Sequence, residues 1–253
     1  HKVSNLIKEA KKPLIIFGQS SLKTKSAKYI FESIKSFLEK NNKISDEWNS
    51  LNTISENAST VGSFDLGLYK TIDGSNEVLK DLENHMFEIV YLLGVDNLKF
   101  EKKNEFIIYQ GSHGDKGAEI ADIILPGAAY TEQNGYFTNL EGKIQKAYKA
   151  SFPPEEAKED WLIINELAEA MNHRKLFNDK DELDSSLLNQ INLFIEKDKS
   201  IKSSTVENTE FKQEVLKVEN EDYYYSNAIA RASKTMLECK KAKVNLKLTG
   251  TEG

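Results

Sequence analysis

The sequence predicts an α/β fold, namely a doubly wound, mostly parallel sheet flanked by helices, with a helical C-terminal extension. Three observations predict it: short continuous apolar runs, amphipathic helical patterns between these runs, and helical patterns alone toward the C-terminus. Strands separated by helices pair in parallel, because a parallel connection needs a long crossover segment. We therefore expect an α/β domain over residues 1–175, and a helical extension and tail over residues 176–253.

Four apolar runs are the predicted strands, at residues 14–17, 87–94, 106–109 and 122–125. Gly18 and Gly94 close the first two runs, and Pro126 with Gly127 stops the fourth. Because the run at residues 14–17 is apolar at every position, we expect that strand to be buried on both faces, as in a parallel sheet.

Apolar residues that recur at spacings of three and four predict helices at residues 2–10, 23–40, 78–83, 158–171, 181–197 and 224–240. The stretch 198–222 is different, since it is rich in Lys, Glu, Ser and Asn and poor in large apolar residues. This composition predicts either a linker or a segment that wraps a partner.

Composition excludes several classes of function. The net charge is −6 and the 34 basic residues are spread along the chain, so we expect no nucleic-acid partner. No apolar run reaches the roughly 18 residues that cross a bilayer, and the N-terminus has no signal-peptide pattern. We therefore expect no direct membrane insertion. One cysteine, Cys239, excludes an internal disulfide and any iron-sulfur or zinc site built from the chain's own thiolates. His1 stands where a Met would begin a complete chain, which predicts a fragment or a processed piece.

A glycine-rich loop follows the third predicted strand, where a doubly wound sheet places its ligand loops. It contains Gly111, His113, Gly114 and Asp115. Its spacing matches neither the dinucleotide-binding motif nor the P-loop, which disfavours nucleotide binding by this loop alone. The structural alternative is a tight strand-to-helix turn that needs a positive φ.

Catalytic roles for single side chains in this region have little support. His113 could donate a proton, but a lone histidine is more often a hydrogen-bonded structural residue. Glu132 and Glu141 lie nine residues apart across a turn predicted at Asn134 and Gly135, so an acid/base pair is conceivable. Carboxylates at such spacing are common on surfaces, and we assign no catalytic residue and no metal ligand.

The run ADIILPGAAYTEQNGYFTNLEGKIQ, residues 121–145, resembles the C-terminal part of the molybdopterin oxidoreductase superfamily. A longer run that begins with YQGSHGDKG at residue 109, followed by PPEEAKEDWLIINELAEAM, narrows the resemblance. Together with YYYSNAIARASKTMLECKKA at residues 223–242, it resembles the large iron-sulfur subunit of respiratory complex I, the 75 kDa subunit of mitochondria. The resemblance runs from about residue 11 to residue 242.

That family implies a region shaped like a molybdoenzyme that has lost its metal and its pterin. The iron-sulfur clusters are then expected in a missing N-terminal part of the subunit, and this chain is expected to hold no cofactor. The resemblance implies a structural and assembly role in the peripheral arm of the proton-pumping complex, which passes electrons from NADH to quinone. The expected partners are the other peripheral-arm subunits and that N-terminal iron-sulfur part. The expected location is the matrix side of the mitochondrial inner membrane, or the cytoplasmic face of a bacterial plasma membrane.

Under this interpretation the glycine-rich region is the inherited scaffold of a former cofactor site. Its residues are Gly111, His113, Gly114, Asp115, Gly135, Asn139, Glu141 and Gly142. Asn139 and Glu141 could still touch a ligand, but we expect them to satisfy backbone groups of their own loop. The alternatives are the C-terminal part of a catalytic molybdopterin enzyme such as a formate dehydrogenase, and a stand-alone nucleotide-binding module.

Overall fold

The computed structural model describes residues 2–22, 24–45, 47–55, 57–68, 75–96, 98, 100–198, 210–214 and 222–248. The chain forms two compact units, and each is assembled from three separate segments. The first unit comprises His1–Leu66, Phe137–Gln145 and Gln190–Val218; the second comprises Gly67–Tyr136, Lys146–Asn189 and Glu219–Gly253. The predicted boundary at residues 175 and 176 is a different division of the chain, and it stays a prediction.

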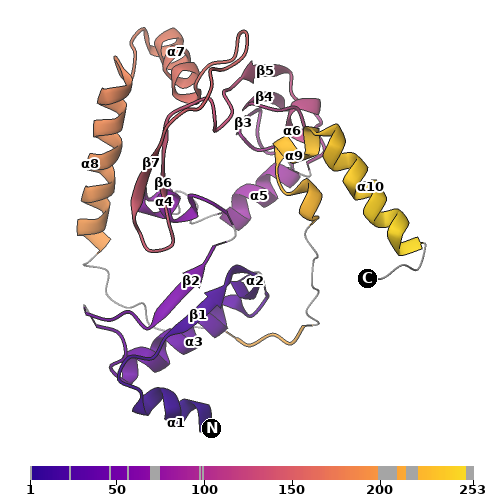
Figure 1. Ribbon diagram of the computed structural model, residues 1–253. Helices are drawn as coiled ribbons and strands as arrows, with labels where there is room; N and C mark the ends of the chain where they lie inside the picture. The colour runs from indigo at the N-terminus through magenta and orange to yellow at the C-terminus, as the bar shows by residue number, and fades with distance from the viewer. Residues whose placement is uncertain are drawn as a thin grey trace. The chain divides into compact units, whose positions relative to one another are not determined.

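The α/β prediction is confirmed (Figure 1). The strands are β1 (Ile15–Gly18), β2 (Leu51–Ile54), β3 (Ile89–Leu93), β4 (Phe106–Gly111), β5 (Ile123–Pro126), β6 (Gly135–Thr138) and β7 (Ile144–Ala147). The helices are α1 (Lys2–Glu9), α2 (Gln19–Leu22), α3 (Ala27–Lys40), α4 (Thr60–Asp65), α5 (Ser75–Glu83), α6 (Lys116–Glu119), α7 (Asp160–Asn172), α8 (Lys180–Asp198), α9 (Ala228–Ala232) and α10 (Lys234–Leu248), with a 3₁₀ turn, η2, at Tyr223–Tyr225. The elements described from α8 onward are all helical.

In the first unit, β1 pairs in parallel with β2, with Ile15 opposite Leu51 and Gly18 opposite Ile54. Helix α3 lies between these strands in the sequence, and its Phe31 ring packs against the buried Phe17 ring at 5.8 Å. Strand β2 is absent from the sequence prediction. Its residues, Leu-Asn-Thr-Ile, are mostly exposed, so this strand needs no continuous apolar run.

In the second unit, β3, β4 and β5 form a parallel sheet with β4 in the centre. Its core is the buried cluster of Leu92, Ile107 and Tyr109. The residues that pack against this cluster are Val90, Leu98, Phe100, Ala118, Ile120 and Ala121. The apolar runs therefore predicted these three strands correctly, although Ile89 of β3 and Ile124 of β5 are 65% and 54% exposed. The expectation that the first run, now β1, is buried on both faces is wrong, since its Ile16 is 53% exposed.

A buried polar network fixes α7 to the sheet of the second unit. Gln110 of β4 is fully buried, and its amide accepts a hydrogen bond from the Tyr91 hydroxyl. The same amide donates to Asp160, the first residue of α7, at 2.8 Å to Oδ1 and 3.2 Å to the carbonyl oxygen. Gln133 donates to the other carboxylate oxygen of Asp160 at 3.0 Å. The buried Gln110 amide thus has partners for its oxygen and its nitrogen, which a low-dielectric interior requires, and the half-buried Tyr91, Gln133 and Asp160 supply or share them.

Strands β6 and β7 form a two-stranded sheet, and the turn between them lies at residues 139–143. The turn predicted at Asn134 and Gly135 is therefore wrong, since Gly135 is the first residue of β6. Instead, Asn134 Oδ1 accepts a hydrogen bond from the Lys149 N–H at 2.9 Å, which positions the ends of the hairpin. The glycine that the turn does require is Gly142, with φ +79°.

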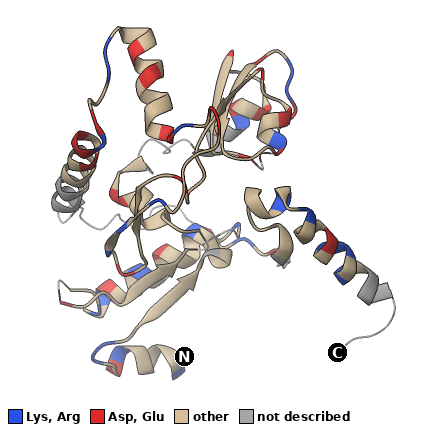
Figure 2. Ribbon diagram, turned by 45° about the horizontal axis from the view of Figure 1, so that its top comes forward, with Lys and Arg blue, Asp and Glu red and all other residues tan. Residues whose placement is uncertain are grey.

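The single C-terminal helix predicted over residues 224–240 is also corrected. Ser233 is extended, with φ −81° and ψ 122°, and separates α9 from α10. Side chains start each helix anew: Asn227 Oδ1 accepts from the Ala230 N–H at 2.9 Å, and Ser233 Oγ accepts from the Met236 N–H at 3.3 Å. Lysines follow along α10 (Figure 2), and Lys240 pairs with Asp222 at 2.8 Å. Of the stretch 198–222, only residues 198, 210–214 and 222 lie within the described part.

Candidate functional site

The loop between β4 and α6 lies at the carboxyl end of the parallel sheet, where such folds bind ligands. It holds Gly111, His113, Gly114 and Asp115, so the structure brings four of the predicted site residues into one loop of the second unit. Asp115 is the N-cap of α6, and its carboxylate accepts a hydrogen bond from the Lys116 N–H at 2.9 Å.

Two glycines at the ends of this loop, Gly111 of β4 and Gly117 of α6, are needed for close packing. A Cβ at Gly117 would overlap the Val95 carbonyl oxygen and the Tyr109 ring, and one at Gly111 would overlap the Tyr109 phenol. A Cβ at Gly114 would meet nothing within 4 Å. The expectation that this turn needs a positive φ is wrong, because the glycines with positive φ in the described part are Gly67, Gly94 and Gly142.

His113 makes the contacts of a structural residue. Its carbonyl oxygen accepts a hydrogen bond from the buried Tyr109 hydroxyl at 2.8 Å. Its ring Nδ1 lies 3.0 Å from the hydroxyl of the adjacent Ser112, in an exposed position. A base that acts in catalysis is usually oriented by a third group, and these local contacts favour a role in shaping the loop.

An arginine from the C-terminal helices forms ion pairs with carboxylates that follow β3 and β4. The Arg231 guanidinium of α9 pairs with the Asp115 carboxylate and, at 3.0 Å, with Asp96, and it donates to the Tyr225 carbonyl at 3.2 Å. The side chains of Arg231, Asp115 and Asp96 are 20%, 17% and 19% exposed, so this contact is largely shielded from water. In Figure 1, α9 accordingly lies beside α6.

The charge of Arg231 acts on the titration of Asp115. Burial raises the pKa of this carboxyl, but the hydrogen bonds from Arg231 and from the Lys116 N–H outweigh burial and hold the pKa below its ordinary value. Sequence reasoning missed both Arg231 and Asp96. The only signal in the sequence was an arginine in the predicted C-terminal helix. A charged side chain on a helix is usually solvated, and the sequence does not indicate which residue it would contact.

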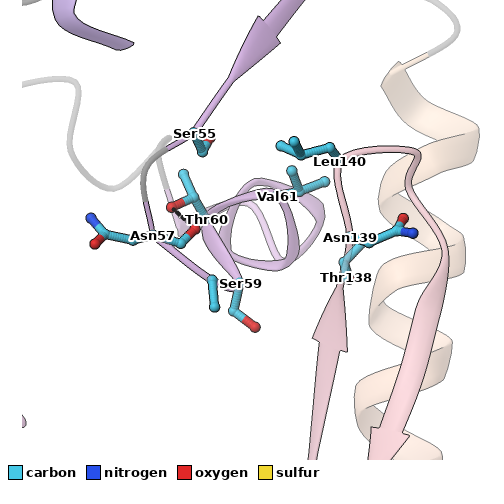
Figure 3. Close-up of a pocket in the computed structure, with 9 residues that line it drawn as sticks. Ser55, Asn57, Ser59, Thr60, Val61, Thr138, Asn139 and Leu140 are labelled. Atoms are coloured by element: carbon cyan, nitrogen blue, oxygen red, sulfur yellow. Dashed lines mark hydrogen bonds between the residues drawn. The ribbon is translucent and has the colours of Figure 1, made fainter. Parts of the chain in front are cut away.

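A second candidate place lies in the first unit, where a cavity of about 230 Å³ opens beside the hairpin turn (Figure 3). It is lined by Ser55, Asn57, Ala58, Ser59, Thr60 and Val61 from the connection between β2 and α4, and by Thr138, Asn139 and Leu140 from the hairpin. All nine lining side chains are uncharged. The cavity is smaller than the roughly 300–1,000 Å³ of typical small-molecule sites.

The hairpin turn beside this cavity holds Asn139, Glu141 and Gly142. Asn139 Oδ1 accepts hydrogen bonds from the N–H groups of Glu141 and Lys143, at 3.0 and 2.9 Å. In Figure 3 its amide points away from residues 55–61 and toward its own turn. The expectation that Asn139 satisfies backbone groups of its loop is confirmed.

Buried contacts hold this turn against α4. Thr138 is buried and hydrogen-bonds the Asp65 side chain, while burial raises the pKa of Asp65. Gly62 of α4 lies so close that a Cβ there would be 3.2 Å from Thr138 Oγ1. The turn therefore has a packing role that needs no ligand.

We expect Asn139→Ala to lower stability by about 1 kcal/mol, because two turn N–H groups lose their acceptor while water partly replaces it. Thermal unfolding of the full-length subunit would measure the loss. Asn134→Ala, which removes one such bond to Lys149, is the matched control and should cost less. An Asn139→Ala variant that unfolds like the wild type would show that these two hydrogen bonds do not stabilise the turn.

The other two predicted positions have local roles. Gly135 begins β6 and has open space around it. Glu132 Oε2 accepts a hydrogen bond from the Ala129 N–H at 2.9 Å, which ties its own loop together. Glu132 belongs to the second unit and Glu141 to the first, so the two carboxylates are not part of one compact unit.

Within the described ranges, no three or more His, Cys, Asp or Glu side chains are grouped so that they could hold a metal ion. No helix in that part of the chain combines the length and the apolar character needed to cross a membrane.

Comparison with known proteins gives the family. The family model for molybdopterin oxidoreductases matches residues 1–170. This chain belongs to the molybdopterin oxidoreductase family. A second family model describes the C-terminal region of the G subunit of NADH-ubiquinone oxidoreductase, and it matches residues 191–239, which include Arg231. We call residues 191–239 the tail segment.

Curated relatives of this chain are named as subunits of the same oxidoreductase as in the second family model. The G subunit of the NADH-quinone oxidoreductase of Rickettsia bellii is 38% identical in an alignment that covers 99% of this chain and 36% of that protein. The NADH-ubiquinone oxidoreductase 75 kDa subunit of Reclinomonas americana is 35% identical, over 94% of this chain and 35% of that protein. The mitochondrial NADH-ubiquinone oxidoreductase 78 kDa subunit of Candida albicans is 33% identical, over 94% of this chain and 34% of that protein.

The resemblance to the large iron-sulfur subunit of complex I is thus confirmed. The chain spans about a third of the length of these relatives.

The family name implies a molybdopterin cofactor, whose phosphate requires donors and positive charge. Neither candidate place fits it. At the ends of β3 and β4, the Arg231 guanidinium is already paired with two carboxylates. The cavity of the first unit has an uncharged lining and a volume of about 230 Å³. We therefore derive no chemical step through this cofactor.

Proposed function

We propose that this chain is a structural part of the peripheral arm of the proton-pumping NADH:quinone oxidoreductase, complex I, and that it holds no redox centre. The match of the tail segment to the NADH-ubiquinone oxidoreductase model supports membership in that complex. Electrons from NADH then pass to quinone through cofactors outside this chain. The partners are other peripheral-arm subunits and the iron-sulfur part of the same subunit.

The observation that carries the structural role is the contact of Arg231 with Asp115 and Asp96. It places a residue of the tail segment on the loop that, in a doubly wound fold, would receive a ligand. The pairing of Arg231 with Asp115 of this loop and with Asp96, and the close packing of Gly111 and Gly117 on Tyr109, stabilise the loop without a cofactor. The arm lies on the matrix side of the mitochondrial inner membrane, or on the cytoplasmic side in a bacterium.

The alternative is the C-terminal part of a catalytic molybdopterin enzyme such as a formate dehydrogenase. The match of residues 1–170 to the general family model is compatible with it. The second match, of the tail segment, favours the complex I role.

Purification of the assembly that contains the whole subunit would test both proposals. We expect native mass spectrometry to find many co-purifying subunits, and elemental analysis to find iron but no molybdenum. One molybdenum per subunit that survives dialysis against a chelator would overturn the proposed absence of a cofactor. A stable subunit without partners would overturn the structural role in complex I.

A further inference from the structure

A short described part of the tail segment, residues 210–214, packs in the first unit against the start of α3. Its sequence is Glu-Phe-Lys-Gln-Glu. These residues lie within the match to the NADH-ubiquinone oxidoreductase model, whereas α3 lies within the match to molybdopterin oxidoreductases. The contact therefore joins the two parts of the chain that the two family models describe.

We propose that residues 210–214 are a docking motif, and that the start of α3 is a binding surface for this extended peptide. The occupant is the chain's own motif, which Lys25, Ser26 and Tyr29 hold. The proposed docking goes beyond the role in complex I and does not depend on it. Two alternatives were open for the stretch 198–222, a linker and a segment that wraps a partner. For residues 210–214 the docking favours a segment that packs on a surface, here one of the same chain.

The strongest argument is the use of Ser26. A serine at the N-cap of a helix normally accepts a hydrogen bond from the second or third N–H of that helix. Ser26 is the N-cap of α3, but its side chain makes no such bond. Instead, its buried hydroxyl donates to the Lys212 carbonyl oxygen and accepts from the Lys212 N–H, both at 2.8 Å. The Ser26 hydroxyl therefore bonds the backbone of Lys212 in place of an N–H group of its own helix.

Two side chains of the motif complete the contact. Glu214 Oε1 accepts from the Lys25 N–H at 2.7 Å, which places a negative charge at the positive end of the α3 dipole. Lys25 precedes the N-cap Ser26, so this carboxylate stabilises the start of α3 by its charge and does not bond the helix's own free N–H groups. The Phe211 ring packs edge-on against Tyr29 of α3, with ring centroids 6.0 Å apart, in a geometry that aromatic pairs favour.

These contacts define which positions of the motif matter. Glu214 contacts the surface through its carboxylate and Phe211 through one edge of a ring that is 64% exposed, whereas Lys212 contacts it through its backbone alone. The Lys212 side chain is exposed. The surface should therefore tolerate any residue other than proline at position 212, since proline has no N–H to donate.

Hydrogen exchange on the full-length subunit in its assembly would test the proposal. We expect Ser26→Ala, Phe211→Ala and Glu214→Ala each to accelerate exchange of residues 210–214, by about 10-fold where a backbone hydrogen bond is lost. Lys212→Ala is the matched control and should leave exchange unchanged. Exchange of β4 should stay at the wild-type rate in all four variants, which shows that the fold is intact.

A synthetic peptide of residues 208–216 provides the second measurement. Added to the Phe211→Ala variant, it should restore slow exchange at residues 24–30, whereas a peptide that carries Phe211→Ala should not. Three results would overturn the proposal: fast exchange of residues 210–214 in the wild type, an effect of Lys212→Ala equal to that of Ser26→Ala, or no response to the peptide.

Discussion

Gly117→Ala should destabilise the second unit by about 3 kcal/mol, which corresponds to a loss of about 6–12 °C in melting temperature. The added methyl group would overlap the Val95 carbonyl oxygen, which is backbone and cannot rotate away, and also the buried Tyr109 ring. Helix propensity acts in the opposite direction, because alanine is better than glycine in a helix such as α6 by about 1 kcal/mol. Overlap with a fixed backbone atom is the larger effect, so the net change is destabilising.

The matched control is Gly114→Ala in the same loop. A Cβ at Gly114 would meet nothing within 4 Å, so we expect a change within about 0.5 kcal/mol. Differential scanning fluorimetry of the full-length subunit would compare the two variants. Equal stability of the two would show that the loop is not packed as described, and that its glycines have another purpose.

Arg231→Met should lower stability at neutral pH by about 2 kcal/mol, because Asp115 and Asp96 lose their shared cation while they stay largely shielded from water. Water offsets part of this lost stability, because the side chains of Asp115 and Asp96 are 17% and 19% exposed and stay partly hydrated. Arg174→Met, at an exposed arginine of the same unit, is the control and should change stability little. We also expect less assembled complex with Arg231→Met, but normal NADH:quinone turnover in each complex that assembles.

The effect of Arg231→Met should depend on pH. Because the pKa of Asp115 is lowered in the folded state, its contribution is fully present above the ordinary carboxyl value of 3.8 and is lost as the pH falls through the lowered pKa. The difference in melting temperature between wild type and Arg231→Met should therefore be constant from pH 7 down to about pH 5 and shrink below about pH 4. A difference that persists unchanged at pH 2 would show that Arg231 acts by packing alone.

The strands β3, β4 and β5 could be predicted because a continuous apolar run has few other uses in a chain of this length. The run at residues 106–109 becomes the buried centre of a sheet, with Ile107 and Tyr109 in its core. Strand β2 and the hairpin of β6 and β7 could not be predicted in the same way. Their residues are exposed or half-buried, apart from the buried Thr138, and none of the three strands has a continuous apolar run. The position of β2 also depends on β1, which lies far along the chain.

The site shows the same division. The glycines at 111 and 117 were visible as a loop, but the reason for them is the Tyr109 ring and the Val95 carbonyl, which only the folded chain brings near. Asn139 was correctly expected to bind its own turn, because its partners lie within four residues. Arg231 meets Asp115 across 116 residues of sequence, and no spacing rule connects them.

The sequence by itself determined the α/β class, the helical C-terminal region and the resemblance to the large iron-sulfur subunit of complex I, since these rest on local periodicity and on motifs that read in order along the chain. The tertiary structure alone decided that Arg231 of the tail segment pairs with Asp115 in the loop between β4 and α6, and that Ser26 bonds the backbone of Lys212 instead of its own helix. The physical reason is the range of the interactions. Hydrophobic periodicity acts between near neighbours, whereas an ion pair or a hydrogen bond between distant segments exists only after the chain has folded.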